Sequence, residues 1–293
     1  MERVEDYKKA GEISVKVKEF ARSIIKPGVA LVDVADKIEG KIIELGGELA
    51  FPVNLSVDEI AAHYTPSSDD DSEARGLLKV DIGVHVDGAI ADTAFSMDLT
   101  EDRRHEELIL ASALALESAL KIVKSGVSLS EVGAVIQKSI VDSGFSPIRN
   151  LSGHKLDVYT VHAGLTVPSY ENNNPTKLEE GAYAIEPFAT PGQGLVYDGG
   201  NSGIYRLEKE GNVRDPTARK ILKYIKDNYS TLPFCERWLT KQFGSRTRTA
   251  LLFLEKAGLL HHYAQLVEKS RAPVSQAEHT VLLYDGKVEV TTK

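Results

Sequence analysis

The sequence predicts an α+β fold built from two similar α/β halves, related by a pseudo-twofold axis, with a helical subdomain inserted in the second half. Three observations predict this fold. Residues 25–47 and 123–145 align at a constant offset, a β-hairpin pattern follows the first copy, and a second hairpin pattern is interrupted by a helix-rich segment. A repeat at a fixed offset indicates two copies of one structural unit.

Composition limits the classes of protein to consider. With 293 residues, 42% of them hydrophobic, the chain is long enough to bury a full core. It has no run of about 18 apolar residues, and its charged start, MERVEDYKKAGE, is expected to be a helix rather than a signal sequence, so a cytoplasmic location is expected. The single cysteine excludes an internal disulfide, and the net charge of −8 argues against nucleic acid as the main ligand.

The first two elements are predicted to be helices. Apolar residues recur at helical spacing over residues 2–25, and Lys26-Pro27-Gly28 ends that pattern. A second helix is predicted to start at Asp33 and to end at Gly46-Gly47. The second copy has identical residues at the helix stop, the helix start and the core stripe. These matches pair Lys26, Gly28, Val29, Leu31, Val34, Ile38, Ile42 and Gly46 with Lys124, Gly126, Val127, Leu129, Val132, Ile136, Ile140 and Gly144.

Residues 79–95 predict a β-hairpin with the turn Asp87-Gly88, because this dipeptide accepts the positive φ of a type I′ turn. The register places Asp92 opposite Gly83 and on the same face as Asp81. Diagonal Cβ atoms lie about 7 Å apart, so two carboxylates can reach one shared point, and Gly83 is expected to leave room for what they hold. A register shifted by one residue would separate them. Aspartates are also common near turns, so this stretch alone leaves open both a metal site and ordinary turn residues.

The second hairpin is interpreted as divided by an insertion. An apolar strand over residues 182–188 carries Glu186, and the returning strand is predicted at residues 276–283, which carry Glu278. Residues 195–272 are therefore assigned to a helical insertion subdomain in the turn of this hairpin. Residues 1–194 and 273–293 are assigned to the main domain.

The two copies also bring histidines close to the hairpins. Asn54-Leu55-Ser56 in the first copy is taken as the counterpart of Asn150-Leu151-Ser152 in the second. His63 follows the first triplet, and His154 and His162 follow the second.

Each hairpin contributes two carboxylates to one place, if the pseudo-twofold axis holds. These are Asp81, Asp92, Glu186 and Glu278. Buried carboxylates need shared protons or cations, and two divalent ions would balance four negative charges. Carboxylates with one imidazole suit Mn, Fe, Co or Zn. His154 is the expected fifth ligand, because the preceding Gly153 lets the backbone come close.

Five stretches together resemble the type 2 methionine aminopeptidases, in the short form typical of archaea, and the resemblance covers essentially the whole chain. The stretches are FPVNLSVDEIAAHYTP (51–66), KVDIGVHVDGAIADTA (79–94), LSGHKLDVYTVHAG (151–164), AIEPFAT (184–190) and QAEHT (276–280). Each stretch alone is moderately specific for this family, and the five stretches in this order are strong evidence for the resemblance. The resemblance implies the pita-bread fold, which agrees with the internal repeat, and makes residues 1–194 and 273–293 the catalytic domain.

The resemblance implies two metal ions on Asp81, Asp92, His154, Glu186 and Glu278, with Asp92 and Glu278 bridging. It also gives His63 and His162 places on either side of the reacting amide. In such enzymes the ions polarise the carbonyl and activate a bridging water, Glu186 takes a proton, and the histidines bind the oxyanion or the departing amide. By resemblance, the methionine pocket includes Phe51, Val161 and Tyr263, although Phe51 and Val161 also suit a plain core.

The implied reaction is removal of the N-terminal, initiator methionine from nascent proteins and peptides when the second residue is small. A free N-terminal amine bound to a metal would explain cleavage after the first residue alone. Two alternatives are an Xaa-Pro peptidase of the same fold and a binding module of this fold without catalysis. Xaa-Pro peptidases usually have an extra N-terminal domain, which this sequence lacks, and a binding module should have lost ligands, whereas all five positions are intact.

The insertion differs in charge from the rest of the chain. Residues 195–272 contain 14 Lys and Arg but 8 Asp and Glu, whereas the whole chain has a net charge of −8. A solvated helical face is one reading. The other is a transient contact with ribosomal RNA near the exit of nascent chains. No membrane partner is expected, and the family suggests a monomer.

Overall fold

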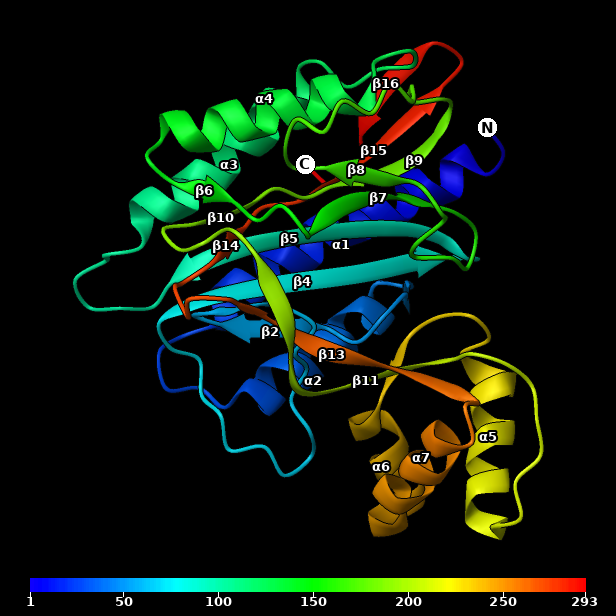
Figure 1. Cartoon of the computed structure of the whole chain (residues 1–293). Helices are drawn as coiled ribbons and strands as arrows, with labels where there is room; N and C mark the ends of the chain where they lie inside the picture. Colours follow the sequence, from blue (N-terminus) through cyan, green and yellow to red (C-terminus); the bar gives the residue numbers. More distant parts are fainter.

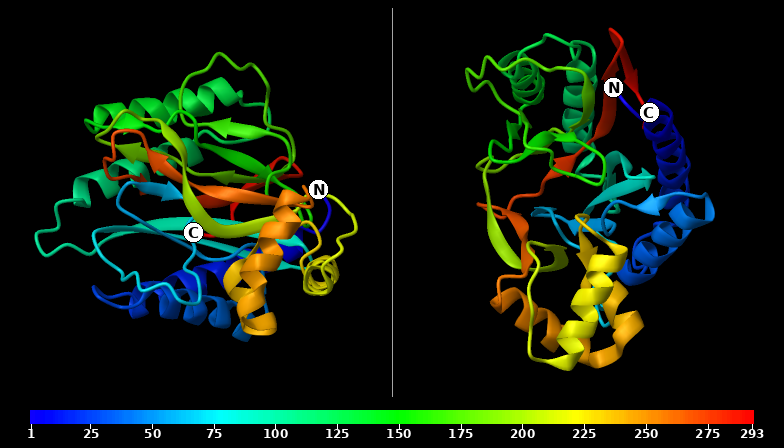
Figure 2. Two further views of the ribbon diagram at one scale, coloured as in Figure 1. Left: turned by 60° about the horizontal axis from the view of Figure 1, so that its bottom comes forward. Right: turned by 90° about the vertical axis from the view of Figure 1, so that its right-hand side faces the viewer.

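Each half of the chain packs two helices against the outer face of an antiparallel sheet, as a computed structural model of residues 1–293 shows (Figure 1). In Figure 2 the helices of the two halves lie on opposite outer sides, with the strands between them. The first half comprises α1 (Val4–Ile24), α2 (Leu31–Glu44), β1 (Glu48–Leu49), β2 (Asn54–Val57), β4 (Leu77–Val86) and β5 (Ala89–Asp98). The second comprises α3 (Glu106–Leu120), α4 (Leu129–Asp142), β7 (Ser152–Leu156), β8 (Thr166–Pro168), β9 (Gly181–Ile185), β15 (His279–Tyr284) and β16 (Lys287–Val290). A small sheet joins β6 (Ser146–Pro147), β10 (Phe188–Thr190) and β14 (Ser275–Gln276).

Each half has a hydrophobic core of its own. The core between α1, α2 and the first sheet contains 20 buried residues, and the core around α3, α4 and the second sheet contains 19. Each half therefore buries the outer face of its own sheet against its own helices. The functional side chains are therefore left to the surface where the two halves meet.

The repeat predicted from the sequence is confirmed in the helices. Both α2 and α4 have 14 residues, and they begin 98 positions apart, at Leu31 and Leu129. The start predicted at Asp33 is wrong by two residues. The first turn of α2 lacks a side-chain cap, and the Leu31 N–H instead donates to the carbonyl of Ser72 at 2.8 Å.

The equivalence of the two Asn-Leu-Ser triplets is also wrong. Asn54 is the first residue of β2, and the first residue of β7 is Ser152, again 98 positions later. The second triplet therefore lies two residues too early, mostly in the turn that precedes β7. The fold repeats at a constant spacing even where the residue types do not.

The first hairpin has the predicted register. Val86 pairs with Ala89, and Gly83 pairs with Asp92. The turn residues Asp87 and Gly88 have φ values of 49° and 87°, as a type I′ turn requires. Asp81 and Asp92 therefore lie on one face of the hairpin.

The second hairpin is present and is divided as predicted. His279 pairs with Ile185 and Gln276 pairs with Phe188, and this continuous register puts Glu278 opposite Glu186. Between the two arms lie β11 (Val196–Leu207), α5 (Pro216–Asn228), β12 (Phe234–Cys235), α6 (Glu236–Phe243), a 3-10 turn (Gly244–Arg246), α7 (Thr247–Lys256) and β13 (Leu260–Glu268).

The inserted segment contains more strand than the sequence predicted. β11 and β13 pair with each other, and β13 also pairs with β3 (Ile60–Ala62) of the first half. Two register shifts interrupt the β11–β13 ladder, so the sequence lacks the regular alternation of a strand. The helices α5, α6 and α7 enclose a separate core of 12 buried residues. The domain boundaries at 194/195 and 272/273 stay predictions.

No helix of the structure combines the length and the apolar character needed to cross a bilayer.

Candidate metal centre

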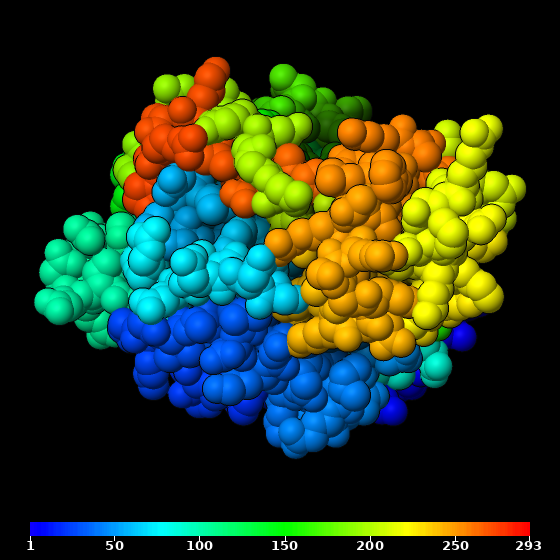
Figure 3. Space-filling model, turned by 90° about the horizontal axis from the view of Figure 1, so that it is seen from below, coloured from blue at the N-terminus to red at the C-terminus, as the bar shows by residue number.

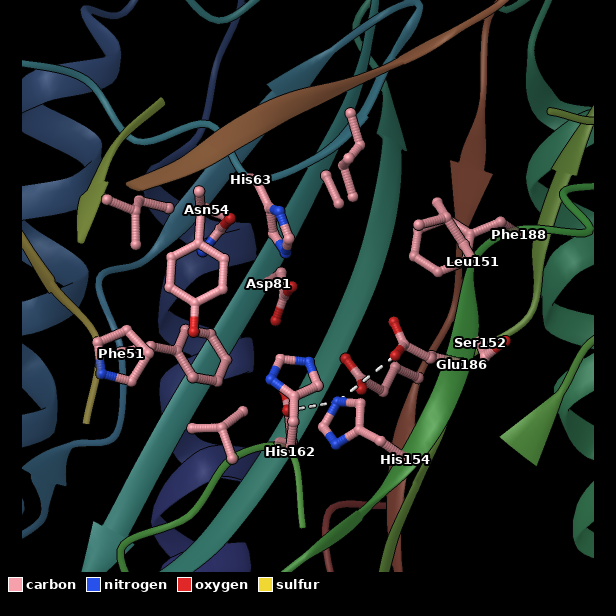
Figure 4. A pocket seen from close by; sticks show the side chains of 18 of the residues that line it. Phe51, Asn54, His63, Asp81, Leu151, Ser152, His154, His162, Glu186 and Phe188 are labelled. Carbon is pink, nitrogen blue, oxygen red and sulfur yellow. Dashed lines mark ion pairs between the residues drawn. The ribbon is translucent and has the colours of Figure 1, made fainter. Parts of the chain in front are cut away.

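A cavity of about 290 Å³ lies between the two hairpins and the β11–β13 pair (Figure 4). Every site residue predicted from the sequence lines it. These are Phe51, His63, Asp81, Asp92, His154, Val161, His162, Glu186, Tyr263 and Glu278. Ligand pockets in proteins range from about 300 to 1,000 Å³, so this cavity suits one side chain and a short stretch of backbone.

Three buried side chains at the floor of the cavity have the spacing of metal ligands. One ligand atom each of Asp92, His154 and Glu278 lies within 4.8 Å of the others. His154 Nε2 lies 3.7 Å from Asp92 Oδ2 and 3.5 Å from Glu186 Oε1, the two pairs drawn as dashed lines in Figure 4. Asp81 lines the same floor, so all five predicted ligands meet there.

Hydrogen bonds between the two hairpins fix the carboxylates. The Thr280 hydroxyl both donates to the Asp92 carbonyl and accepts from the Asp92 N–H, each at 2.7 Å. The Glu278 N–H donates to the Ala94 carbonyl at 3.0 Å. The Thr93 hydroxyl donates to the Glu278 carbonyl at 2.9 Å. The strands that carry Asp92 and Glu278 are thus joined through backbone groups and threonine hydroxyls, which leaves both carboxylates free to bind.

His154 reaches the floor because a glycine precedes it. A Cβ on Gly153 would lie 2.3 Å from the carbonyl oxygen of Ala184 on the neighbouring strand β9. A side chain there would push β7 away from β9. The close approach expected from the sequence is therefore present.

Four buried polar atoms of these potential ligand side chains have no hydrogen-bond partner. They are Asp81 Oδ1, Asp92 Oδ1, Glu278 Oε2 and His154 Nδ1. Buried polar atoms of proteins are almost always paired, and unpaired ones call for an explanation such as a bound ion. Four carboxylates and one imidazole are also a donor set that first-row divalent ions accept. The residues present therefore fit metal ions.

Burial and mutual repulsion shift the pKa values of these groups toward their neutral forms. Burial raises the pKa of Asp81 to about 7. Burial, with repulsion from the neighbouring carboxylates, raises the pKa of Asp92, Glu186 and Glu278 well above the usual range. Burial lowers the pKa of His154 to about 3. A bound cation would favour the charged form of the carboxylates and lower their pKa values, and the neutral imidazole is already the form that binds metal.

These pKa shifts predict how a metal should stabilise the protein as pH changes. A carboxylate with a raised folded-state pKa stabilises the fold below its unfolded pKa, and this contribution is lost as pH rises through the folded value. For Asp81 the window runs from about 3.8 to about 7, and the other three carboxylates shift in the same direction. The gain in Tm on adding excess Mn²⁺ to chelated protein should therefore be several degrees larger at pH 8 than at pH 6.

Scanning calorimetry at both pH values, with and without Mn²⁺, measures this difference. Buried Lys79, whose pKa is lowered by burial to about 7, titrates with the opposite sign. It contributes equally with and without the ion, so it cancels in the difference. A gain in Tm that is independent of pH would contradict a site made of these carboxylates.

Two further histidines face the metal-ligand cluster. The rings of His162 and His154 are 4.2 Å apart between centroids, and His63 packs edge-on against Tyr263 at 5.3 Å (Figure 4). Burial lowers the pKa of His63 to about 4 and also lowers that of His162. Both side chains are therefore neutral near pH 7, and each can donate one hydrogen bond and accept another.

The remaining wall of the cavity is largely apolar. Phe51 and Val161 line it and also belong to a buried hydrophobic cluster between the halves. Both interpretations of these residues, as part of the pocket wall and as part of the core, therefore apply. The expectation that Gly83 leaves room for a metal is wrong. A Cβ there would lie 2.3 Å from the Phe51 ring, which occupies that space.

Several wall residues were not predicted from the sequence. They are Leu151, Phe188, Ile204, Pro233 and Leu266. Phe188 could have been found, because it lies only two residues after Glu186, at the start of β10. Ile204 and Leu266 lie on β11 and β13, the strands that the sequence did not reveal.

Comparison with known proteins identifies the family. Residues 5–215 match metallopeptidase family M24. The chain is 44% identical over 296 residues to a methionine aminopeptidase of Methanocaldococcus jannaschii, with 99% of each chain covered. The chain belongs to the methionine aminopeptidases of family M24. It is also 37% identical to methionine aminopeptidase 2 of Clavispora lusitaniae, covering 99% of this chain and 71% of that one, which supports the type 2 resemblance.

Solved structures confirm the pita-bread fold. The TM-score is 0.82 with a thermophilic Arx1, at 17% identity, covering 98% of this chain and 89% of that one. It is 0.71 with a methionine aminopeptidase from Thermotoga maritima, at 22% identity, covering 99% and 96%. At these identities the likeness concerns the fold alone. The predicted enzyme class, a metal-dependent aminopeptidase, is confirmed by the family.

Proposed function

We propose that the enzyme removes the initiator methionine from nascent proteins and peptides whose second residue is small, with two divalent ions at the carboxylate cluster. The observation that carries this proposal is the group of five potential ligands, four with unpaired buried atoms, beside a largely apolar cavity. Family membership supplies the reaction, and the cavity supplies the place where one methionine side chain would lie.

The proposed ligands, which would hold the ions, are Asp81, Asp92, His154, Glu186 and Glu278. The close grouping of Asp92, His154 and Glu278 supports one ion, and Asp81 and Glu186 provide the donors for a second. Bound Mn, Fe, Co or Zn ions would act as Lewis acids, polarising a carbonyl and making a water molecule more acidic.

The other steps belong to residues of the chain. Glu186 takes the proton of the attacking water at its carboxylate, which the neighbouring Gln276 amide orients from 3.4 Å. Neutral His162, which lies beside His154, and neutral His63 donate hydrogen bonds to the oxyanion or to the departing amide. Phe51, Val161 and Tyr263 enclose the methionine side chain and keep water from it. A cavity of this size leaves little space beyond the scissile bond, which supports a requirement for a small second residue.

A series of tripeptides Met-Xaa-Ser tests this specificity. With Mn²⁺ present, kcat/KM for methionine release should fall as Xaa grows, by about 100-fold or more from Ala to Lys, because a large side chain would displace the reacting amide. Met-Gly-Ser serves as the second small substrate, and Ala-Pro-Ser tests the Xaa-Pro alternative. Equal rates for Met-Ala-Ser and Met-Lys-Ser would contradict the size requirement. Hydrolysis of Ala-Pro-Ser alone would favour an Xaa-Pro peptidase.

The proposed substrates are made in the cytoplasm, so we infer that the enzyme acts there. We also infer that it is a monomer and that its insertion contacts the ribosome. The supporting surface is the exposed face of α5, which carries Arg219, Lys220, Lys223 and Lys226. Of these four, Lys223 and Lys226 also pair with Asp227 and Glu210 of the insertion itself. Four other basic residues of the insertion pair with acidic residues of the first half, namely Arg237, Lys241, Arg248 and Arg271.

Replacing the four α5 residues by Gln should weaken co-sedimentation with ribosomes and reduce its dependence on salt, because fewer phosphate contacts release fewer counterions. The matched control replaces the exposed Arg103 and Arg104 by Gln. Co-sedimentation unchanged by the α5 substitutions would reject this contact and leave the peptidase proposal intact.

A further inference from the structure

An ion-pair network on α6 has no part in the chemistry described above. The side chain of Arg237 is fully buried, with 0% of its surface exposed, and all five of its N–H donors are used. Nη1 and Nη2 donate to the two carboxylate oxygens of Glu39, each at 2.8 Å. Nη1 also donates to Asp36 at 2.7 Å. These bonds connect the insertion to α2, and Figure 3 shows the orange helices of the insertion lying against that part of the first half.

The remaining two donors of Arg237 bind a different segment. Nε donates to the carbonyl of Pro66 at 3.0 Å, and Nη2 donates to the Thr65 hydroxyl at 3.3 Å. Thr65 and Pro66 lie two and three residues after His63. The guanidinium therefore ties the chain just beyond His63 to α6 and, through Glu39, to α2.

The backbone of His63 needs such support. His63 has φ of 60°, the left-handed region that residues other than glycine rarely adopt, and surrounding contacts must hold such a residue in place. On its N-terminal side, Ala62 pairs with Leu266 of β13. On its C-terminal side, the Thr65 N–H donates to the Ser202 carbonyl on β11, next to the bonds from Arg237. Both flanks of His63 are thus held by residues of the insertion.

Glu39 extends the network toward the metal ligands. Its Oε1 accepts from the Val53 N–H at 3.3 Å, and its Oε2 accepts from the Trp238 indole at 2.8 Å. The residue after Val53 is Asn54, which pairs with Asp81 on β4. One buried ion pair therefore contacts both the His63 segment and the strand beside Asp81.

We propose that Arg237 and Glu39 are positioning residues: they hold His63 in its catalytic orientation through Thr65 and Pro66. This inference rests on the proposed role of His63. It assigns the insertion a part in the reaction, because the group that fixes one of the two cavity histidines comes from α6.

A purely structural role is the alternative, in which the pair fastens the insertion to the first half and nothing more. The two roles differ in what a neutral replacement should do. Replacing a buried ion pair by neutral side chains of similar volume often preserves stability, whereas removing one partner leaves a buried charge unpaired. In Arg237→Met with Glu39→Gln, called the neutral pair variant below, the single amide oxygen of Gln keeps an acceptor for one of the two donors, the Val53 N–H or the Trp238 indole. The bonds to Thr65 and Pro66 are lost.

The positioning role predicts that the neutral pair variant keeps its fold and its metal content but loses kcat roughly 10- to 100-fold, because the misplaced histidine no longer meets the transition state. KM should change little. Lys241→Met is the matched control, since Lys241 joins the insertion to Asp36 without touching Thr65 or Pro66. Its kcat should stay within about twofold of wild type. Unchanged kcat in the neutral pair variant would overturn the proposal.

A double-mutant cycle locates the effect. If the network acts through His63, the neutral pair substitutions should cost little further kcat in a His63→Ala background. Losses that simply multiply would show that the network acts elsewhere, and would overturn the proposal. Arg237→Lys keeps the charge beside Glu39 but not the full set of bonds. It should lose kcat in the same way, and it serves as the test if the neutral pair variant is unstable.

Hydrogen exchange provides a readout that needs no activity. Peptides covering residues 60–70 should exchange at least about tenfold faster in the neutral pair variant, while α5 and α7 keep their wild-type rates. Unchanged exchange in residues 60–70 would overturn the proposal even if activity falls. If the wild-type enzyme releases no methionine with any metal, the proposed function has failed, and the exchange experiment still decides whether the network holds the His63 segment.

Discussion

Replacing Asp92 by Asn should lower kcat/KM for methionine release by roughly 10³-fold or more, because the Lewis-acid contribution that would be lost with this proposed ligand is worth several kcal/mol. The same substitution should leave the metal-free protein as stable as wild type or more stable. Burial and repulsion raise the pKa of Asp92, so its charged form is unfavourable when no cation is present. Release assays, metal analysis and calorimetry of the chelated protein measure the three quantities.

The matched control is Asp87→Asn on the same hairpin. Asp87 is exposed in the turn, and asparagine also accepts its φ of 49°. This variant should match wild type in activity and metal content. An Asp92→Asn enzyme that retains metal and activity would rule out Asp92 as a ligand.

Replacing His63 or His162 by Ala should lower kcat by roughly 10²- to 10³-fold each, the usual cost of removing one donor to a developing oxyanion. Metal content should not change, because neither side chain belongs to the proposed ligand set. KM for a Met-Ala-Ser peptide should change little if the histidines act mainly in the transition state. Steady-state kinetics with parallel metal analysis separate this result from that of Asp92→Asn.

His105→Ala is the control for the histidine variants, because His105 lies at the start of α3, outside the cavity. It should leave kcat unchanged. A fall in metal content in His162→Ala would instead place His162, whose ring packs on His154, among the ligands.

Local signals explain why much of the fold could be predicted from the sequence. The glycines in the turn between the two helices of each copy, Gly28 and Gly126, both have positive φ, at 81° and 90°, which residues with a Cβ rarely adopt. Asp87-Gly88 set the register of the first hairpin, and the register alone decides that Asp81 and Asp92 share a face. These are short-range requirements on residue type, so they appear directly in the sequence.

Features that depend on contacts distant in the chain could not be predicted in this way. The space beside Gly83 belongs to Phe51, which reaches it from another segment. The strands β11 and β13 form an irregular ladder that hides the alternation of apolar residues. Arg237 and Glu39 are separated by 198 residues, and in the sequence each resembles an ordinary surface charge on a helix.

The candidate site could be predicted from the sequence only in part. Its ligands fall on or beside hairpin strands whose registers are set by turns and pairing, so the residues could be proposed from spacing, chemistry and family resemblance. Its apolar wall comes partly from the insertion, through Ile204, Tyr263 and Leu266, and the placement of those strands is a tertiary property.

The most direct test is methionine release from a Met-Ala-Ser peptide by chelated protein, measured before and after adding Mn²⁺ or Co²⁺. The account predicts no release from the chelated enzyme, restored release with metal, and none from Asp92→Asn at the same metal concentration. A folded, metal-loaded wild-type protein that releases no methionine would contradict it, and so would release that persists after complete removal of metal.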